Sequence, residues 1–141
     1  MSESAPEIHE VKKMRKQINH VKLFHESFGI ENKTKPNSNL AEKVYNLRYN
    51  LMKEENDEYL DACEKGDMVE IADALGDMMY ILCGTILSHG LQGKIEEIFE
   101  EIQRSNMSKL DENGKPIYRE DGKILKSKKY FKPNISKILS S

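Results

Sequence analysis

Acidic side chains recur at helical spacing in two neighbouring segments of the chain. In the first segment, two glutamates continue an apolar stripe that runs at intervals of three and four residues from Leu40 to Leu51. In the second segment, three acidic residues lie at i, i+3 and i+7 among mostly apolar neighbours. Helical periodicity therefore predicts that five carboxylates point toward an interior. They are Glu55, Glu58, Glu70, Asp73 and Asp77.

Gly66 separates these two segments, and we expect an antiparallel helical hairpin that turns there. Residues at equal distances from the turn then face each other, so Glu58 lies near Asp73. Glu55 faces Asp77 by the same rule. Ionised carboxylates without partners are costly to bury together, and only one lysine, at the turn, lies in this stretch. The pattern predicts a divalent cation site, and all-oxygen ligation favours Mg²⁺, with Mn²⁺ as a substitute.

Other interpretations stay open beside the metal site. Asp67 and Glu70 fit a capping box at the start of the second helix, which alone would explain Glu70. A carboxylate-bridged di-iron bundle would need Glu-x-x-His pairs, but the residues three positions after Glu55 and Glu70 are acidic. A helical interaction protein without enzymatic activity would show no measurable loss when Glu55 is changed conservatively.

Apolar periodicity predicts an all-α fold, a bundle of about four helices per chain followed by an irregular basic C-terminal segment. We expect a single domain over residues 1–141, with a helical core at about 6–105 and a C-terminal segment at about 106–135. Four helices are expected. The first starts at Ser4–Glu7 and ends at Gly29, and the second runs from an Asn39 cap to Lys65. The third runs from Asp67 to Gly90, and the fourth covers Ile95–Ile102. The polar linker at 31–39 could be mobile or act as a lid.

The third expected helix is apolar nearly all round from Met78 onward, and Gly84 would allow another element to approach it closely. One chain of four helices offers few elements to cover it. Self-association would supply the missing cover, so we expect a homodimer or homotetramer.

Charge is unevenly distributed in this chain of 141 residues, although the formal net charge is only −2. The acidic hairpin is followed by a lysine-rich segment from Gln103 onward, which contains the turn dipeptides Asn113-Gly114 and Asp121-Gly122. Residues 118–125 could form a small ribbon around the second turn. The acidic body would repel a polyanion, so we expect no duplex nucleic acid as partner. Several lysines are expected to form a solvated tail, namely Lys123, Lys128, Lys129 and Lys132.

Cysteine use and hydropathy bear on location. Cys63 and Cys83 are isolated on apolar helix faces and are expected to be small core residues in a reducing compartment. The N-terminus lacks a hydrophobic signal region, and the apolar run from Met78 to Leu87 is too short to span a bilayer. We expect a cytoplasmic protein with no membrane partner.

Aromatic and histidine side chains gather near the end of the first expected helix. His20, Phe24 and Phe28 could form a packed aromatic end with an exposed histidine, or a wall for a flat ligand such as a nucleobase.

Two sets of residues resemble a known family. Glu54-Glu55-x-x-Glu58, eleven residues, then Glu70-x-x-Asp73 resembles the EExxE…ExxD signature of the all-α nucleoside triphosphate pyrophosphohydrolases, the MazG-like and dimeric dUTPase superfamily. Ser105 to Lys109, Asp121 to Lys126 and Tyr130-x-x-Pro133 are similar to one bacterial and phage branch of the MazG-like proteins. The resemblance covers residues 18–135, roughly.

The resemblance implies Mg²⁺-dependent hydrolysis of a nucleoside triphosphate, a (d)NTP, in which water attacks the α-phosphorus and releases pyrophosphate and a nucleoside monophosphate. Such an activity would serve control of the nucleotide pool. Glu54 would orient or deprotonate the water, and Asp77 would be an extra ligand or support the ligands. The implied metal ligands are Glu55, Glu58, Glu70 and Asp73. The implied phosphate-binding residues are Asn106, Lys109, Lys126 and Tyr130.

Overall fold

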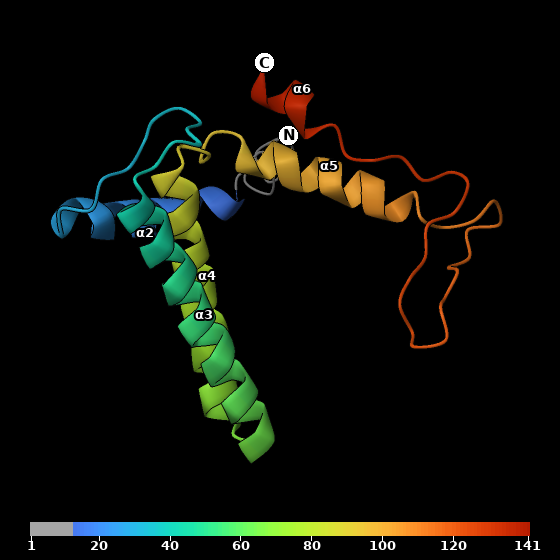
Figure 1. Ribbon diagram of the computed structural model, residues 1–141, viewed down its shortest axis with the longest axis horizontal. Coiled ribbons are helices and arrows are strands. Elements are labelled where there is room, and N and C mark those ends of the chain that lie inside the picture. The colour runs from blue at the N-terminus through green and yellow to red at the C-terminus, as the bar shows by residue number, and fades with distance from the viewer. Residues whose placement is uncertain (1–12) are drawn as a thin grey trace, which may run out of the picture. The chain divides into compact units, whose positions relative to one another are not determined.

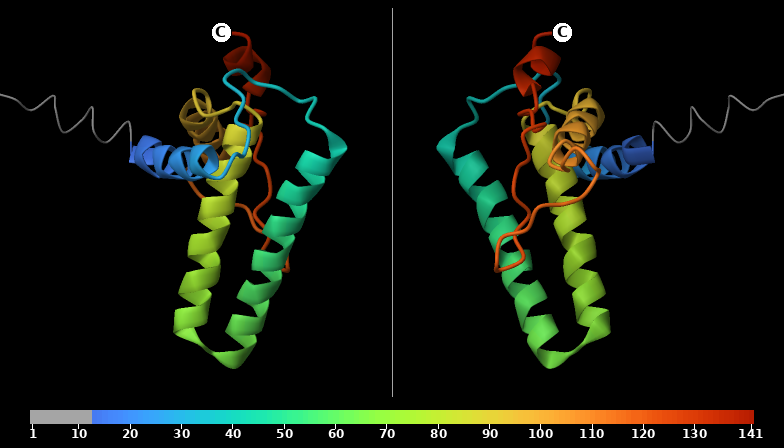
Figure 2. Two further views of the ribbon diagram at one scale, coloured as in Figure 1. Left: turned by 90° about the vertical axis from the view of Figure 1, so that its left-hand side faces the viewer. Right: turned by 90° about the vertical axis from the view of Figure 1, so that its right-hand side faces the viewer.

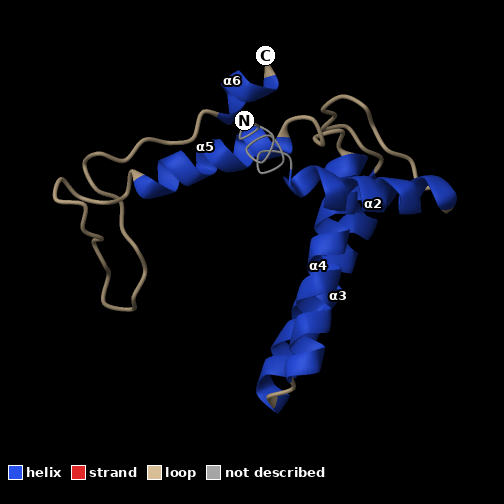
Figure 3. Cartoon of the chain, turned by 180° about the vertical axis from the view of Figure 1, so that it is seen from behind, coloured by secondary structure: helices blue, strands red, loops and turns tan. Residues whose placement is uncertain are grey.

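The computed structural model describes residues 13–141 and is helical throughout its regular elements (Figure 1). No strand occurs among the described residues, as the colouring of Figure 3 shows. The all-α prediction is therefore confirmed, with five described helices in place of about four. The predicted helix start at Ser4–Glu7 lies outside the described residues. The helices are α2 (Lys13–Ser27), α3 (Glu42–Lys65), α4 (Met68–Ser88), α5 (Ile95–Met107) and α6 (Ile135–Leu139).

The described residues pack as two compact units, the first ending at Gly93 and the second covering residues 94–141. The first unit contains α2, α3 and α4, and the second contains α5 and α6. A single domain over the whole chain stays a prediction.

The turn between α3 and α4 lies at Gly66, as predicted. Gly66 adopts a φ of 65°, a left-handed conformation that a side chain would disfavour. Its N–H and that of Asp67 donate to the last carbonyls of α3, at 3.1 Å to Cys63 and 3.0 Å to Ala62. Asp67 then caps α4, because its Oδ1 accepts a hydrogen bond from the Glu70 N–H at 3.2 Å. Local signals therefore end α3 and begin α4. From the turn, the two helices extend in the same general direction (Figure 2).

The predicted cap at Asn39 is wrong. α3 begins at Glu42, after Ala41, and no side chain caps it. The Ala41 carbonyl accepts the first helical hydrogen bonds, from Val44 at 2.9 Å and Tyr45 at 3.2 Å. The Asn39 N–H instead donates to Oδ1 of Asn37 at 2.7 Å, so the linker makes its own turn before the helix starts.

The core of the first unit lies where α2 crosses α4. Ile18 and Val21 of α2 are buried, as are Ile86 and Leu87 of α4. α2 ends as predicted near Gly29, where the Ile30 N–H donates to the His25 carbonyl at 2.8 Å. This short core holds the end of α4 that lies far from the Gly66 turn.

The linker between α2 and α3 is attached to the end of α4. The Lys33 N–H donates to the Leu87 carbonyl at 3.0 Å, and the Asn37 N–H donates to the His89 carbonyl at 2.9 Å. The Gln92 side chain returns a hydrogen bond to the Lys33 carbonyl at 2.8 Å. The first two bonds reach carbonyls at the C-terminal end of α4, a region where a helix leaves acceptors for other partners. The linker is therefore hydrogen-bonded to the rest of the first unit, and its being mobile or acting as a lid stays a prediction.

α4 differs from the expectation drawn from its apolar run. As a whole, Met68–Ser88 is long and apolar enough to cross a membrane, a test of length and composition that core helices of soluble proteins also pass. Asp73 and Asp77 interrupt it, and α3 packs along it. Its Cys83 is buried as predicted, whereas Cys63 of α3 is exposed, which corrects the expectation of a core position: among the described helices of the first unit, α3 packs on α4 and α2 packs on the other end of α4.

The second unit combines α5, two turns and α6. α5 continues to Met107, so Asn106 lies in its last turn rather than opening the irregular region. The ribbon predicted at 118–125 is a single antiparallel bridge between Tyr118 and Ile124. α6 was not predicted; Asn134 caps it, and the Asn134 N–H donates to Glu101 of α5 at 2.8 Å.

We expect Gly84→Ala to destabilise the fold. A methyl group there would lie 2.5 Å from Nη2 of Arg48 and 2.8 Å from Nε2 of His25, both buried. Overpacking of this kind costs about 1–3 kcal/mol of unfolding free energy. Gly76→Ala is the matched control on the same helix, because nothing lies within 4 Å of its added carbon. That control should gain about 0.5–1 kcal/mol from helix propensity. Equal denaturation midpoints for the two variants would contradict the close packing at Gly84.

Candidate functional site

Carboxylates of α3 and α4 gather around Glu55. Its side chain is half-buried, and its Oε1 atom is buried without any hydrogen-bond partner. Burial of the carboxylate raises the pKa of Glu55, and neighbouring negative charges raise it further. In decreasing order of effect, these neighbours are Glu58, Asp77, Asp73 and Glu54. The hairpin therefore brings acidic residues from both helices together, in the way that their spacing predicted.

The other carboxylates of this group do not lie in an interior. Glu58, Asp73 and Asp77 are exposed in the single chain, which corrects the expectation that all five point inward. The reason is the number of covering elements. Within the described part of the first unit, α3 and α4 face each other at this level, while α2 packs on α4 at the far end, near Leu87.

Glu70 stands apart from the group in this structure. It is exposed, it lies in the first turn of α4, and it is not among the charges that raise the pKa of Glu55. Its backbone N–H is capped by Asp67, which is half of the capping box that the sequence suggested. Its role as a metal ligand stays a prediction.

One observation indicates that the residues around Glu55 suit a cation. A buried carboxylate oxygen that lacks a donor, with four negative neighbours, is stabilised by a positive charge placed beside it. Among the described residues, no group of three or more His, Cys, Asp or Glu side chains is already arranged to hold a metal. The exposed carboxylates would therefore change rotamer to ligate one, which exposed side chains do readily.

Two pairs of predicted phosphate-binding residues lie at the end of α5 in the second unit. Asn106 lies in the last turn of α5, and its carbonyl accepts a hydrogen bond from the Lys109 N–H at 3.1 Å. Nζ of Lys126 lies 4.8 Å above the ring of Tyr130, a cation–π contact. Each pair is therefore assembled locally, and their binding of phosphate stays a prediction.

Serine residues that the sequence analysis did not single out for a role connect these pairs. Ser105 donates to the Phe131 carbonyl at 2.8 Å, and Ser127 donates to the Ser108 carbonyl at 2.9 Å. Oγ of Ser108 accepts from the Phe131 N–H at 3.1 Å. Hydroxyl groups at a helix end can bond many backbone groups, so no sequence signal showed which they would choose.

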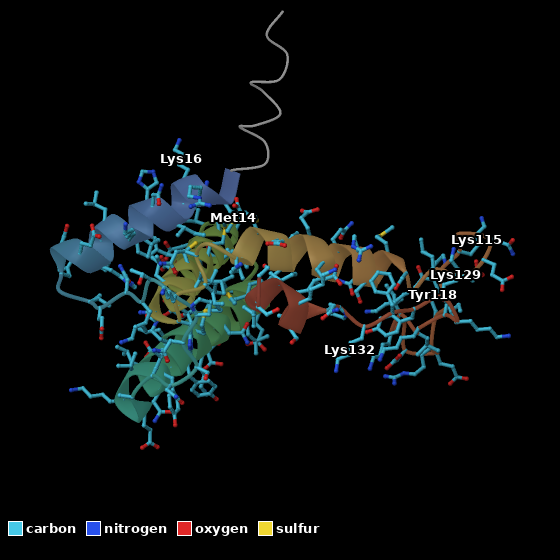
Figure 4. All side chains as sticks on the ribbon, turned by 90° about the horizontal axis from the view of Figure 1, so that it is seen from above. Met14, Lys16, Lys115, Tyr118, Lys129 and Lys132 are labelled. Carbon is cyan, nitrogen blue, oxygen red and sulfur yellow. The ribbon has the colours of Figure 1, made fainter. Side chains whose placement is uncertain are left out.

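Lysines of the second unit that were expected to form a solvated tail are exposed, namely Lys123, Lys128, Lys129 and Lys132. Figure 4 shows Lys129 and Lys132 on the loops that follow α5, together with Lys115 and Tyr118.

The aromatic end of α2 is partly assembled. Phe24 contacts Phe28, with ring centroids 4.5 Å apart, and meets the edge of Tyr80 on α4 at 5.6 Å. Phe24 also lines a cavity of about 530 Å³ between α2, the linker, α3 and α4. His20 and Phe28 are exposed and do not line it. A base pocket at these residues stays a prediction.

The cavity lies farther along the hairpin than the carboxylates around Glu55 and does not include them. Leu51 of α3 and Tyr80 of α4 line it, and each is within one helical turn of a carboxylate in sequence. Its polar residues include His25 and Arg48, which the sequence analysis missed because both occupy positions where apolar residues are usual.

Comparison with known proteins gives one family. The family model of phosphoribosyl-ATP pyrophosphohydrolase matches residues 21–106. The matched range contains all the carboxylates around Glu55 and ends at Asn106, before Lys109, Lys126 and Tyr130. No curated protein matches the chain.

We expect Glu55→Gln to raise the melting temperature of the protein in chelator at neutral pH. The folded state raises the pKa of Glu55, so this group adds stability only below its unfolded pKa, and that stability is lost as pH rises through the folded pKa. The advantage of the variant should therefore shrink as the buffer is made acidic. Asp57→Asn on the same helix is the control, because Asp57 is exposed and pairs with Lys53 at 3.1 Å. A gain for the control as large as that for Glu55→Gln would argue against the buried site.

Proposed function

Because the chain belongs to the phosphoribosyl-ATP pyrophosphohydrolase family, which lies within the all-helical MazG-like nucleoside triphosphate pyrophosphohydrolases, we propose that it is a nucleotide pyrophosphohydrolase. The family match covers more than half of the 141 residues. Membership of the dimeric dUTPase-like subgroup stays a prediction. The observation that carries the proposal is the buried, unpartnered Oε1 of Glu55 among carboxylates of both hairpin helices.

The proposed substrate is a nucleoside triphosphate, a (d)NTP or a phosphoribosyl-ATP-like nucleotide. The oxygen of water forms a bond to the α-phosphorus, and the bond from that phosphorus to the oxygen bridging the α- and β-phosphates breaks. Pyrophosphate leaves and a nucleoside monophosphate remains. Such chemistry asks the protein mainly for positioning and for charge that offsets the phosphate oxygens.

The family depends on a divalent metal, typically Mg²⁺. When bound, such an ion neutralises phosphate oxygens and lowers the pKa of water. Glu55 and Glu58 on α3 would hold it, with Asp73 and Asp77 on α4, because the charges of the other three raise the pKa of Glu55. Glu70 would join them by its place in the acidic motif.

Glu54 is proposed to accept the proton of the attacking water. It is exposed, and its charge acts on Glu55, so it borders the group without being buried in it. That position suits a base that must meet solvent water and then release the proton. In the second unit, Lys109 and Lys126 are proposed to offset charge on the outer phosphates, and Tyr130 to support Lys126 through its ring.

The working unit is proposed to be at least a dimer. α4 exposes a stripe of large apolar side chains at i, i+4 and i+7, with Leu75 46% exposed, Met79 53% and Leu82 46%. Stripes of this kind on a helix are normally covered by another helix. A second copy would also cover the carboxylates that the single chain leaves exposed.

Pyrophosphate release by the purified protein with Mg²⁺ is the experiment that tests the activity, with canonical and modified (d)NTPs and phosphoribosyl-ATP as substrates. We expect Glu54→Gln to lower kcat by about a hundredfold or more, because a general base is lost, while nucleotide binding stays near that of the parent. Lys109→Ala should instead raise KM for a triphosphate, with a smaller penalty for a diphosphate. If Lys109→Ala and Lys126→Ala both keep the parental KM and kcat, the basic segment has no part in catalysis.

Light scattering after size-exclusion chromatography tests the assembly. At micromolar concentration, we expect a particle of at least twice the mass of the chain. Leu82→Glu should shift it toward the monomer, because a charge would be buried in the apolar contact. Glu100→Lys in α5 serves as a control for a change of charge on an exposed helix position. A folded parental monomer at that concentration would contradict the proposal.

A further inference from the structure

Arg48 is a buried cation without a counter-charge among the described residues. Its side chain lies in the middle of the first unit, and the residue is only 6% exposed. Nε donates to Oγ1 of Thr85 at 3.1 Å, and Nη2 donates to the Ile81 carbonyl at 3.0 Å, both on α4. Both acceptors are neutral, and no carboxylate of the described residues forms an ion pair with Arg48. Burial accordingly lowers the pKa of the guanidinium.

A guanidinium in this state is costly to the fold. Neutral acceptors offset part of the lost hydration, whereas a buried charge normally needs an opposite charge as well. An apolar residue of similar length would fill the same position without that cost. A chain that keeps Arg48 here therefore has a use for its unpaired charge.

Arg48 is one of the residues that line the cavity of about 530 Å³. Its Nη1 atom makes no hydrogen bond with the described residues. Among the described residues, the side-chain atoms that are both fully buried and without a hydrogen-bond partner are Glu55 Oε1 and Gln92 Oε1. Nη1 of Arg48 has no partner and is not one of them, so it keeps accessible surface. A cavity of this volume is in the usual range for organic ligands, about 300–1,000 Å³.

His25 stands beside Arg48. Nδ1 of His25 lies 2.6 Å from Oδ1 of Asn32, an acceptor, so Nδ1 donates and holds the ring in place. Nε2 of His25 and Nη2 of Arg48 both lie within 3 Å of one point next to Gly84, so the missing side chain of Gly84 leaves room for both. His25 lines the cavity and is only 2% exposed.

The remaining walls define the kind of molecule that would fit. Phe24, Leu47 and Tyr80 give apolar surface, while Lys33 and Lys43 add positive charge. Glu31 also lines the cavity, but its charge is paired with Lys33 at 2.9 Å. The polar lining is thus net positive around a mostly apolar interior.

We propose that this cavity is a second binding site that takes an organic oxyanion, a carboxylate or phosphate ester with a flat or apolar body. Nη1 of Arg48 donates to the oxyanion, and the apolar walls contact the body. Arg48 and Glu55 are seven residues apart on one face of α3, so about 10 Å of helix separates this site from the carboxylates. The oxyanion belongs either to a separate metabolite or to the far end of the substrate itself.

Phenyl phosphate is the probe, with benzyl alcohol as its neutral counterpart. Binding is measured by calorimetric titration in the presence of a chelator. Without a cation, the carboxylates around Glu55 repel anions, so binding at the cavity is measured apart from the proposed activity. We expect phenyl phosphate to bind the parent and benzyl alcohol to bind far more weakly. Arg48→Met should weaken phenyl phosphate binding by about tenfold or more, the scale of a hydrogen bond to a charged group. Lys53→Met removes a charge from an exposed position on the same helix and should bind like the parent.

A second variant guards against misfolding of Arg48→Met. Leu47→Trp keeps the arginine and fills the cavity, so it should also lose phenyl phosphate while the circular dichroism spectrum stays helical. Competition by phenyl phosphate in the Mg²⁺ hydrolysis assay would assign the oxyanion to the substrate, and binding without competition would assign it to a separate metabolite. No binding to the parent, or equal binding to Arg48→Met, would overturn the proposal. A third result would also overturn the proposal, namely that the parent does not bind phenyl phosphate and that Arg48→Met no longer forms a dimer. That result would indicate that a carboxylate of the second copy is the counter-charge of Arg48.

Discussion

Repulsion between carboxylates at one level of the α3–α4 hairpin is the constraint on which the rest of the first unit depends. The turn at Gly66 places residues of both helices around Glu55, and the burial of its side chain raises its pKa. Small residues close to this level, Ala62 and Ala74, are buried between the helices and allow close approach. The contacts between α3 and α4 themselves oppose the repulsion, and the core where α2 crosses α4 fixes the other end of α4.

Two polar sites of opposite charge share one face of α3. Glu55 and Arg48 are two helical turns apart, and both occupy positions that periodicity assigns to apolar residues. Each weakens the core by itself, since a buried charge is stabilised only by partners. Such departures from an apolar core are expected at functional sites, where stability is given up for binding. The neutral partners of Arg48 and the negative neighbours of Glu55 leave both sites able to gain from a ligand of opposite charge.

The second unit has a different kind of order. Its buried apolar residues are few, Ile98 and Ile138 among them, and hydrogen bonds from serine side chains fix the basic loop on the end of α5. Bonds of this kind keep Lys126 beside Tyr130 without a large core. The phosphate-binding role proposed for this segment would benefit from that construction, because exposed lysines can meet a ligand while the backbone that carries them stays in place.

The sequence by itself determined the features that depend on neighbours along the chain. Helical periodicity, the glycine at position 66 and the cap at Asp67 act within a few residues, so the hairpin and its acidic stripes were predictable. Tertiary structure decided which side chains meet and which remain in solvent. Asn39 formed a turn with Asn37 instead of a cap, Glu70 stayed apart from Glu55, and Arg48 became buried beside His25. These outcomes depend on how helices cross and on how many elements cover each face, and spacing along one helix carries no information about either.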